Sequence, residues 1–280
     1  MEIFKIISLF IIIAKNFEKN MPLNLIFSEG WLLRLVLKWF EENRNLDYDI
    51  TFKNNSLWYS EGALKPYFGK FLHHPSIRNE RYTNPDAVYG DIYINDKNSY
   101  IELNDDCKDF IVVEAKMYSD FTPETNNKPY DQVSRTICCM CVTLYEKYEK
   151  FEKYIKTYSD FFEYLEAFEK IAFYAFLPHK KKFKSKNLSI IDKERIKKTV
   201  DKYINDSLPK SYNDELLREH KNWFDNYFIP FLSKIDLKLF SWEEIIEYIK
   251  KYESSNGIDS KDNYGNRLEK FYNFCKIYNK

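Results

Sequence analysis

The chain has 280 residues, enough to bury a hydrophobic core without disulfides or a structural metal. Its 43 basic side chains balance its 43 acidic ones, so no overall positive charge points to a nucleic-acid partner. Any such binding must come from a local patch. The five cysteines are an odd, clustered set without the spacing of metal ligands, which predicts reduced thiols in a cytoplasmic protein.

The N-terminal apolar stretch from Ile6 to Ala14 is shorter than the about 20 residues that a membrane-spanning helix needs. It also lacks the basic leader and the small-residue cleavage site of a secretory signal. We therefore expect residues 1–20 to be an upstream extension that ends before Met21, with a cleaved signal left open as the alternative. No membrane partner is expected.

The first confident element is a helix that begins after Ser28. Apolar side chains recur every three or four positions as far as Phe40, which is the spacing of an amphipathic helix, and serine is a favoured N-cap residue. The region that follows, 43–81, has a looser pattern. One short helix is expected there, between Glu61 and Phe68.

The pattern changes to strands between Asp86 and Lys116. Three short runs rich in β-branched and aromatic residues are separated by clusters of Asn and Asp, which favour turns. The runs are Ala87 to Ile94, Tyr100 to Leu103, and Phe110 to Ala115. We predict that they form a three-strand meander.

The rest of the chain alternates helices with strands. Helical spacing predicts helices over Tyr130–Tyr148 and Tyr158–Lys170, and the continuous apolar run Ile171–Leu177 indicates a buried strand. Residues 187–280 read as mostly helical, with a short strand at Asp236–Phe240. The predicted class is α/β with a mixed sheet.

Two ionisable residues end the otherwise apolar strand of the meander. Side chains alternate along a strand, so Glu114 and Lys116 emerge side by side on one face. A carboxylate there is costly unless it is paired, and the available partners are the lysine or a divalent cation. Simple pairing of the two at a strand end is the alternative to a functional site.

A second carboxylate can reach this position, because Asp86 opens the first strand of the same meander. Two carboxylates, completed by water and a backbone carbonyl, suit Mg²⁺ or Mn²⁺ better than zinc. Such an ion would activate a water and stabilise charge on a phosphate, while Lys116 positions or helps to deprotonate the water. That chemistry is phosphodiester hydrolysis.

These residues give the chain a resemblance to the PD-(D/E)xK nuclease superfamily of restriction and repair nucleases. The resemblance rests on Pro85-Asp86, on Glu114-Ala115-Lys116 and on the order of elements. The chain is also similar to uncharacterised bacterial proteins that share three further segments, here Ser28–Trp31, Trp58–Glu61 and Gln132–Arg135. The resemblance covers roughly residues 24–180, and it divides the chain into a nuclease-like core, 21–186, and a mostly helical C-terminal extension, 187–280, packed on that core.

The superfamily resemblance implies a role for each matching residue. Asp86 and Glu114 would hold the metal, Lys116 would act on the water, Glu29 on the first helix would assist, and Gln132 on the following helix would orient the site. The implied activity is that of a Mg²⁺-dependent nuclease acting on DNA. Action on RNA is left open.

Several of these assignments have alternatives. Asp86 lies 28 residues before Glu114, a long separation for this motif, so Glu102 or Asp91 could be the second metal ligand instead. Glu29 could merely favour the positive end of its helix dipole. Gln132 and Arg135 share a helix side that could face the site or only solvent.

The function also has an alternative. The neutral net charge and the open choice of aspartate fit a binding or scaffold protein that keeps the nuclease fold without its chemistry. Nucleic acid is the expected partner of the enzyme, and a homodimer is left open.

Overall fold

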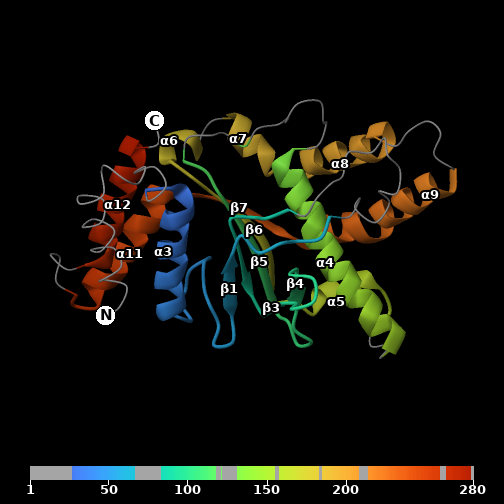
Figure 1. The fold of residues 1–280 in the computed structure, drawn as a ribbon, viewed down its shortest axis with the longest axis horizontal. Helices are drawn as coiled ribbons and strands as arrows, with labels where there is room; N and C mark the ends of the chain where they lie inside the picture. Colours follow the sequence, from blue (N-terminus) through green and yellow to red (C-terminus); the bar gives the residue numbers. More distant parts are fainter. Residues whose placement is uncertain are drawn as a thin grey trace.

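A mixed five-stranded sheet with helices on both of its faces forms the centre of the computed structural model (Figure 1). The model describes residues 27–66, 83–117, 121, 131–154, 158–182, 185–207, 214–258 and 263–278. The predicted α/β class with a mixed sheet is confirmed at this level. The expected extension at residues 1–20 lies outside the described residues.

The strand order in the sheet is β1-β2-β5-β6-β7. The strands are β1 (Leu57–Ser60), β2 (Ala87–Gly90), β5 (Asp109–Ala115), β6 (Lys170–Leu177) and β7 (Asp236–Ser241). Strand β2 runs antiparallel to β1 and β5, whereas β5, β6 and β7 are parallel to one another. A parallel centre covered on both faces explains why β5 and β6 read as continuous apolar runs.

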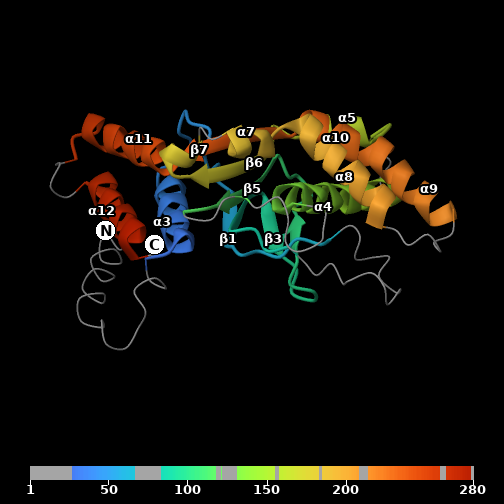
Figure 2. The same cartoon turned by 90° about the horizontal axis from the view of Figure 1, so that it is seen from above.

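Two groups of helices lie at opposite ends of the molecule in both views (Figures 1 and 2). One group contains α3 (Glu29–Glu42), α11 (Trp242–Ser255) and α12 (Tyr264–Tyr278). The other contains α4 (Gln132–Tyr154), α5 (Phe161–Glu166), α8 (Lys193–Ser207), α9 (Asp214–Trp223), the π-helix η2 (Phe224–Phe228) and α10 (Ile229–Lys234). The short helices α6 (His179–Lys182) and α7 (Ser185–Ile190) follow β6.

The sheet separates two hydrophobic cores, and neighbouring residues of one strand enter different cores. Val112 and Phe173 pack in the core that contains α4, α5 and α8. Val113 and Tyr174 pack in the core that contains α3, α11 and α12. This alternation is the period of a β-strand, and it fixes which side chains of β5 face α4.

Most of the long predicted elements are confirmed. Helix α3 begins after Ser28, whose hydroxyl accepts a hydrogen bond from the backbone N–H of Trp31. Helix α4 covers the described part of its predicted range and continues to Tyr154. Strands β6 and β7 occupy the ranges predicted for them, and β7 pairs with β6, so residues 187–280 complete the same sheet.

The predicted three-strand meander is wrong in its pairing. Strand β2 pairs directly with β5, while β3 (Ile92–Ile94) and β4 (Ile101–Leu103) form a separate two-stranded sheet. The run divides at Gly90, which approaches the backbone of Asp109 at a φ of +137°, and at Asp91, whose carboxylate accepts from two backbone N–H groups at the start of β5. The β3–β4 hairpin is therefore an excursion between two paired strands.

Two shorter helices were predicted incorrectly. Residues 61–66 contain no helix, and residues 67–68 lie outside the described part of the chain. The helix predicted over Tyr158–Lys170 is only α5, because Lys170 already begins β6. Strand β1, which pairs with β2, was not predicted at all.

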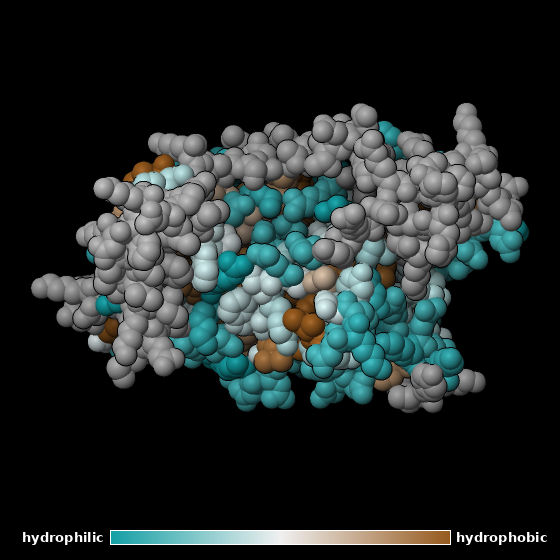
Figure 3. Space-filling view, viewed as in Figure 1, coloured by the Kyte–Doolittle hydropathy of each residue, from teal (hydrophilic) through white to brown (hydrophobic). Residues whose placement is uncertain are grey.

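The described surface in Figure 3 is largely hydrophilic, with small hydrophobic areas over the strands near the middle of the view. The exposed apolar side chains of the chain include Leu57 on β1 and Tyr93 and Ile94 on β3. None of the helices in the described part of the chain has the length and apolar character to cross a membrane.

The junction at Gly90 gives a test of the sheet pairing. A Cβ atom there would lie 1.9 Å from the Asp109 carbonyl oxygen, so Gly90→Ala should lower the free energy of unfolding by roughly 3 kcal/mol or more. Gly257 also has a positive φ but no atom near its Cβ position, so Gly257→Ala should cost about 1 kcal/mol. Urea unfolding measures both. Equal losses would contradict the close approach of β2 and β5.

Candidate active site

Glu114 is a carboxylate with no exposed surface, on the face of β5 that turns toward α4. Gln132 Nε2 donates a hydrogen bond to Glu114 Oε2 at 2.9 Å, and Thr136 Oγ1 donates to Oε1 at 3.2 Å. The two donors lie one helical turn apart on α4, so they reach the same carboxylate. The first turns of α4 therefore fix the Glu114 side chain.

Asp86 reaches the same place from β2. Ala87 pairs with Val113 in the antiparallel register, which puts the preceding Asp86 beside Glu114. Asp86 Oδ2 accepts a hydrogen bond from the backbone N–H of Ala115 at 2.7 Å. Its side chain is 26% exposed, so the site opens toward solvent at this residue.

Lys116 joins the two carboxylates. Its Nζ atom lies 3.6 Å from Glu114 Oε2 and 3.7 Å from Asp86 Oδ2, and its side chain is only 13% exposed. Glu29, the first residue of α3, accepts a hydrogen bond from the backbone N–H of Met117. The structure thus brings together all five residues to which the resemblance gave a role, namely Asp86, Glu114, Lys116, Glu29 and Gln132.

The proton affinities of these groups reflect burial and mutual repulsion. Burial, and then the Asp86 carboxylate, raise the pKa of Glu114 to about 8. Burial also raises the pKa of Glu29. Burial opposes the charge of Lys116, but the carboxylates of Asp86, Glu114 and Glu29 together raise its pKa, so the amine stays an ammonium.

The other two carboxylates considered for the metal do not reach Glu114. Glu102 binds Tyr93, Asn95 and Lys150. Lys150 follows Gln132 by eighteen positions on the same helix, which is about 27 Å along the axis. The sequence assignment of Glu102 as a metal ligand beside Glu114 is therefore corrected.

Asp91 is also far from Glu114 in the sheet. Its Oδ2 atom accepts from the backbone N–H groups of Lys108, at 2.9 Å, and Asp109, at 3.2 Å. These residues are at the start of β5, whereas Glu114 is at its other end. Asp91 supports the strand junction, and Asp86 alone of the three alternatives meets Glu114.

A supporting layer behind Asp86 was not foreseen from the sequence. Ser60 Oγ donates to the Asp86 carbonyl oxygen at 3.3 Å and accepts from Arg34 Nε at 2.9 Å. The backbone N–H of Glu61 donates to the same carbonyl, and the Glu61 carboxylate pairs with Arg34. The Trp58–Glu61 segment thus ties α3 and β1 to the backbone of Asp86.

Thr136 was also missed. The signal that could have found it is its position four residues after Gln132, which puts both side chains on one face of a helix. Its hydroxyl was overlooked because its neighbours, Val133 and Ile137, belong to the apolar stripe of α4.

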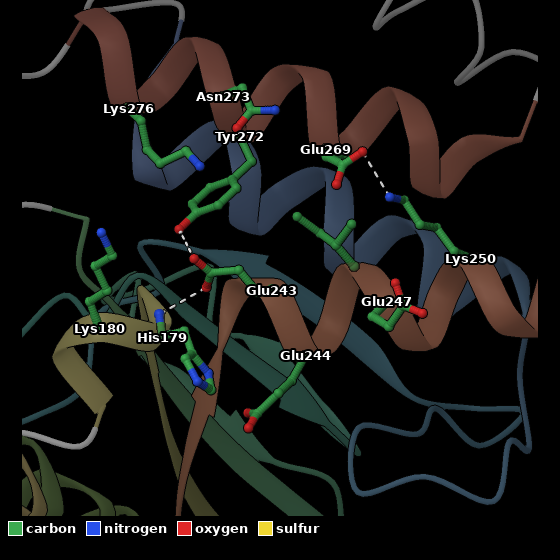
Figure 4. Close-up of a pocket in the computed structure, with 11 residues that line it drawn as sticks. His179, Lys180, Glu243, Glu244, Glu247, Lys250, Glu269, Tyr272, Asn273 and Lys276 are labelled. Carbon is green, nitrogen blue, oxygen red and sulfur yellow. Dashed lines mark hydrogen bonds and ion pairs between the residues drawn. The ribbon is translucent and has the colours of Figure 1, made fainter.

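A groove of about 570 Å³ lies between α6, α11 and α12 (Figure 4). Tyr272 and the backbone N–H of His179 both donate to Glu243 there, at 2.6 and 2.8 Å. The groove contains none of the five site residues. The candidate site is therefore defined by the convergence of ionisable groups and not by this groove.

The chemistry of these carboxylates indicates whether they could bind a divalent ion. Within the described ranges, no set of three His, Cys, Asp or Glu side chains is arranged to hold a metal ion. Magnesium nevertheless often binds through one or two carboxylates, with waters and substrate phosphates as the other ligands. Asp86 and Glu114 supply two such carboxylates, and their mutual repulsion is the kind that a cation relieves, so the residues fit a hard ion that keeps several waters.

Comparisons of the chain with protein-family models, with curated proteins and with solved structures gave no match.

The raised pKa of Glu114 predicts a pH dependence of stability in the metal-free protein. The folded state keeps a proton on Glu114 up to about pH 8, while the unfolded chain releases it near the ordinary value of 4.5, so stability falls as the pH rises through this window. Glu114→Gln cannot ionise. As the pH rises from 5 to 8, the free energy of unfolding of the variant should therefore increase relative to that of the wild type, by up to roughly 1.4 kcal/mol per pH unit.

Urea unfolding in EDTA at several pH values measures this difference. Glu102→Gln is the matched control: although burial opposes it, hydrogen bonds from Lys150, Asn95 and Tyr93 lower the pKa of Glu102, so its removal should leave the slope between pH 5 and 8 unchanged. Parallel curves for the wild type and Glu114→Gln would contradict the buried, protonated state of Glu114.

Proposed function

We propose that this chain is a metal-dependent phosphodiesterase that hydrolyses nucleic acid, with DNA as the first substrate class to test. The observation that carries the proposal is the meeting of Asp86, Glu114 and Lys116 at the end of a buried strand, with Lys116 Nζ within 3.7 Å of both carboxylates. Acidic pairs with an adjacent lysine suit the chemistry of phosphoryl oxygen, where a hard cation and a positioned water are both needed.

The order of elements supports a PD-(D/E)xK core. Helix α3 precedes three antiparallel strands, β1, β2 and β5, once the β3–β4 hairpin is treated as an insertion. Helix α4 then leads into the parallel strand β6. This is the helix, meander, helix and strand order that the resemblance implies, and the inserted hairpin accounts for the long separation between Asp86 and Glu114.

In this mechanism each side chain has a separate task. Asp86 and Glu114 would hold the ion, which when bound stabilises negative charge on the phosphate and lowers the pKa of a water. Gln132 and Thr136 keep Glu114 in one orientation. Lys116, charged and nearly buried, orients the attacking water, and Glu29 fixes the backbone that follows Lys116 through its bond to Met117.

Cleavage assays on plasmid and linear DNA with Mg²⁺ or Mn²⁺ test the proposal. The wild type should cut, and Lys116→Ala should lower the rate by about 10²- to 10⁴-fold, the usual contribution of a positioned acid or base. Lys97→Ala, which removes a charge from the exposed β3–β4 turn, should cut normally. Normal cutting by folded Lys116→Ala would rule out this mechanism, and RNA substrates in parallel decide the nucleic-acid class.

A scaffold protein with a nuclease-like fold is the second candidate. Its support is that Lys116 already lies within 3.7 Å of both carboxyl groups, where a metal ion would bind, and that the described residues offer no three-residue metal set. Titration with Mn²⁺ separates the two functions. An enzyme should bind Mn²⁺ and lose that binding in Asp86→Asn, whereas a folded wild type that binds no Mn²⁺ would favour the scaffold.

A further inference from the structure

Arg135 is a cation beside the candidate site with no counter-ion among the described residues. It lies three positions after Gln132 and immediately before Thr136, the two residues that bind Glu114. Its Nε atom is buried and has no hydrogen-bond partner within the described part of the chain. A guanidinium cannot lose its charge in a protein, so this arrangement costs stability unless an anion completes it.

A second guanidinium, that of Arg195, contacts the residue that precedes α4. Arg195 Nη2, from α8, is 3.1 Å from Asp131 Oδ2, while its Nη1 atom is buried and has no hydrogen-bond partner among the residues that the structure describes. Asp131 precedes α4 and stands four positions before Arg135, which makes the two neighbours on the helix surface. Arg195 therefore neutralises Asp131, and Arg135 is left without a counter-ion among the described residues.

The Asp131 carboxylate is already occupied by protein donors. It is 4% exposed and accepts from the backbone N–H and the hydroxyl of Ser134, at 2.9 and 3.0 Å, as well as from Arg195. Arg195 keeps 29% of its side chain exposed, and Arg135 is also partly exposed. The two unpartnered nitrogens are buried, so an external anion would meet the exposed parts of the two arginine side chains and leave Asp131 in place.

The acidic side chains of the candidate site would require positive charge close by if the substrate is a polyanion. Asp86 and Glu29 outnumber Lys116 even while Glu114 keeps its proton, and a polyanionic substrate would be repelled by them unless positive charge lay close by. The neutral chain offers no general attraction, so a local patch is required. Guanidinium groups suit this role because they bind phosphate through two parallel hydrogen bonds.

We propose that Arg135 and Arg195 bind a backbone phosphate of the nucleic acid, next to the phosphate that is cleaved. This inference rests on the proposed function, and it gives the first turns of α4 two adjacent roles. Gln132 and Thr136 hold the Glu114 carboxylate, and Arg135, on the neighbouring side of the same helix, holds the substrate in register with it.

Binding of a fluorescein-labelled 20-base-pair DNA duplex, measured by anisotropy in EDTA over a range of salt concentrations, tests this site without any cutting. Arg135→Ala and Arg195→Ala should each weaken binding about ten-fold or more at low salt, and each should reduce the salt slope by about one. Arg135→Lys should keep the slope but bind more weakly than the wild type, because it keeps the charge and loses the paired hydrogen bonds.

Lys197→Ala is the matched control, since it removes one exposed positive charge from the opposite side of α8. Its affinity and slope should match the wild type. Thermal melting shows whether each variant is folded, and Arg135→Lys keeps the test valid if the alanine variant is not. Wild-type affinity and slope in folded Arg135→Ala or Arg135→Lys would overturn the inference, as would a wild type that binds no duplex at low salt.

The two proposals fail in different ways. Binding that depends on the arginines, without cleavage under any metal condition, would overturn the enzyme and leave the phosphate site. Metal-dependent cleavage by Arg135→Lys and Arg195→Ala at wild-type affinity and rate would overturn the phosphate site and leave the enzyme.

Discussion

A fully buried carboxylate at the end of an apolar strand is the constraint on which the site depends. Glu114 cannot be left without partners in that position, because removing a charge from water is costly. Its partners are Gln132 and Thr136 from α4 and Lys116, which directly follows β5. Strand β5 and helix α4 are consequently held together at this carboxyl group.

The sheet register then determines which groups can join Glu114. Antiparallel pairing of β2 with β5 places Asp86 beside Glu114. The start of α3 places Glu29 beside Met117, the residue after Lys116. Ser60 and Arg34 hold the backbone of Asp86 from behind. Asp86 and Lys116 lie directly beside the ends of β2 and β5, and their partners come from α3 and α4, which is the kind of support that a positioned catalytic group requires.

Local patterns predicted the parts of this structure that local forces determine. The serine cap of α3, the apolar stripe of α4 and the Glu114-Lys116 pair depend on neighbours within a few residues. Strand pairing does not depend on near neighbours in the sequence. The runs containing β2, β3 and β4 have similar composition, so the local pattern does not indicate that β2 pairs with β5. The break at Gly90 and Asp91 depends on contacts with Asp109, which the sequence pattern does not show.

The central claim is that Asp86 and Glu114 share one hard divalent ion. Anomalous diffraction from crystals soaked in MnCl₂ tests it most directly. We expect a single strong peak about 2.1 Å from a carboxylate oxygen of each residue, with Lys116 moved from between them. Well-ordered crystals at saturating Mn²⁺ that show Lys116 still bridging the two carboxylates and no peak beside them would contradict the claim.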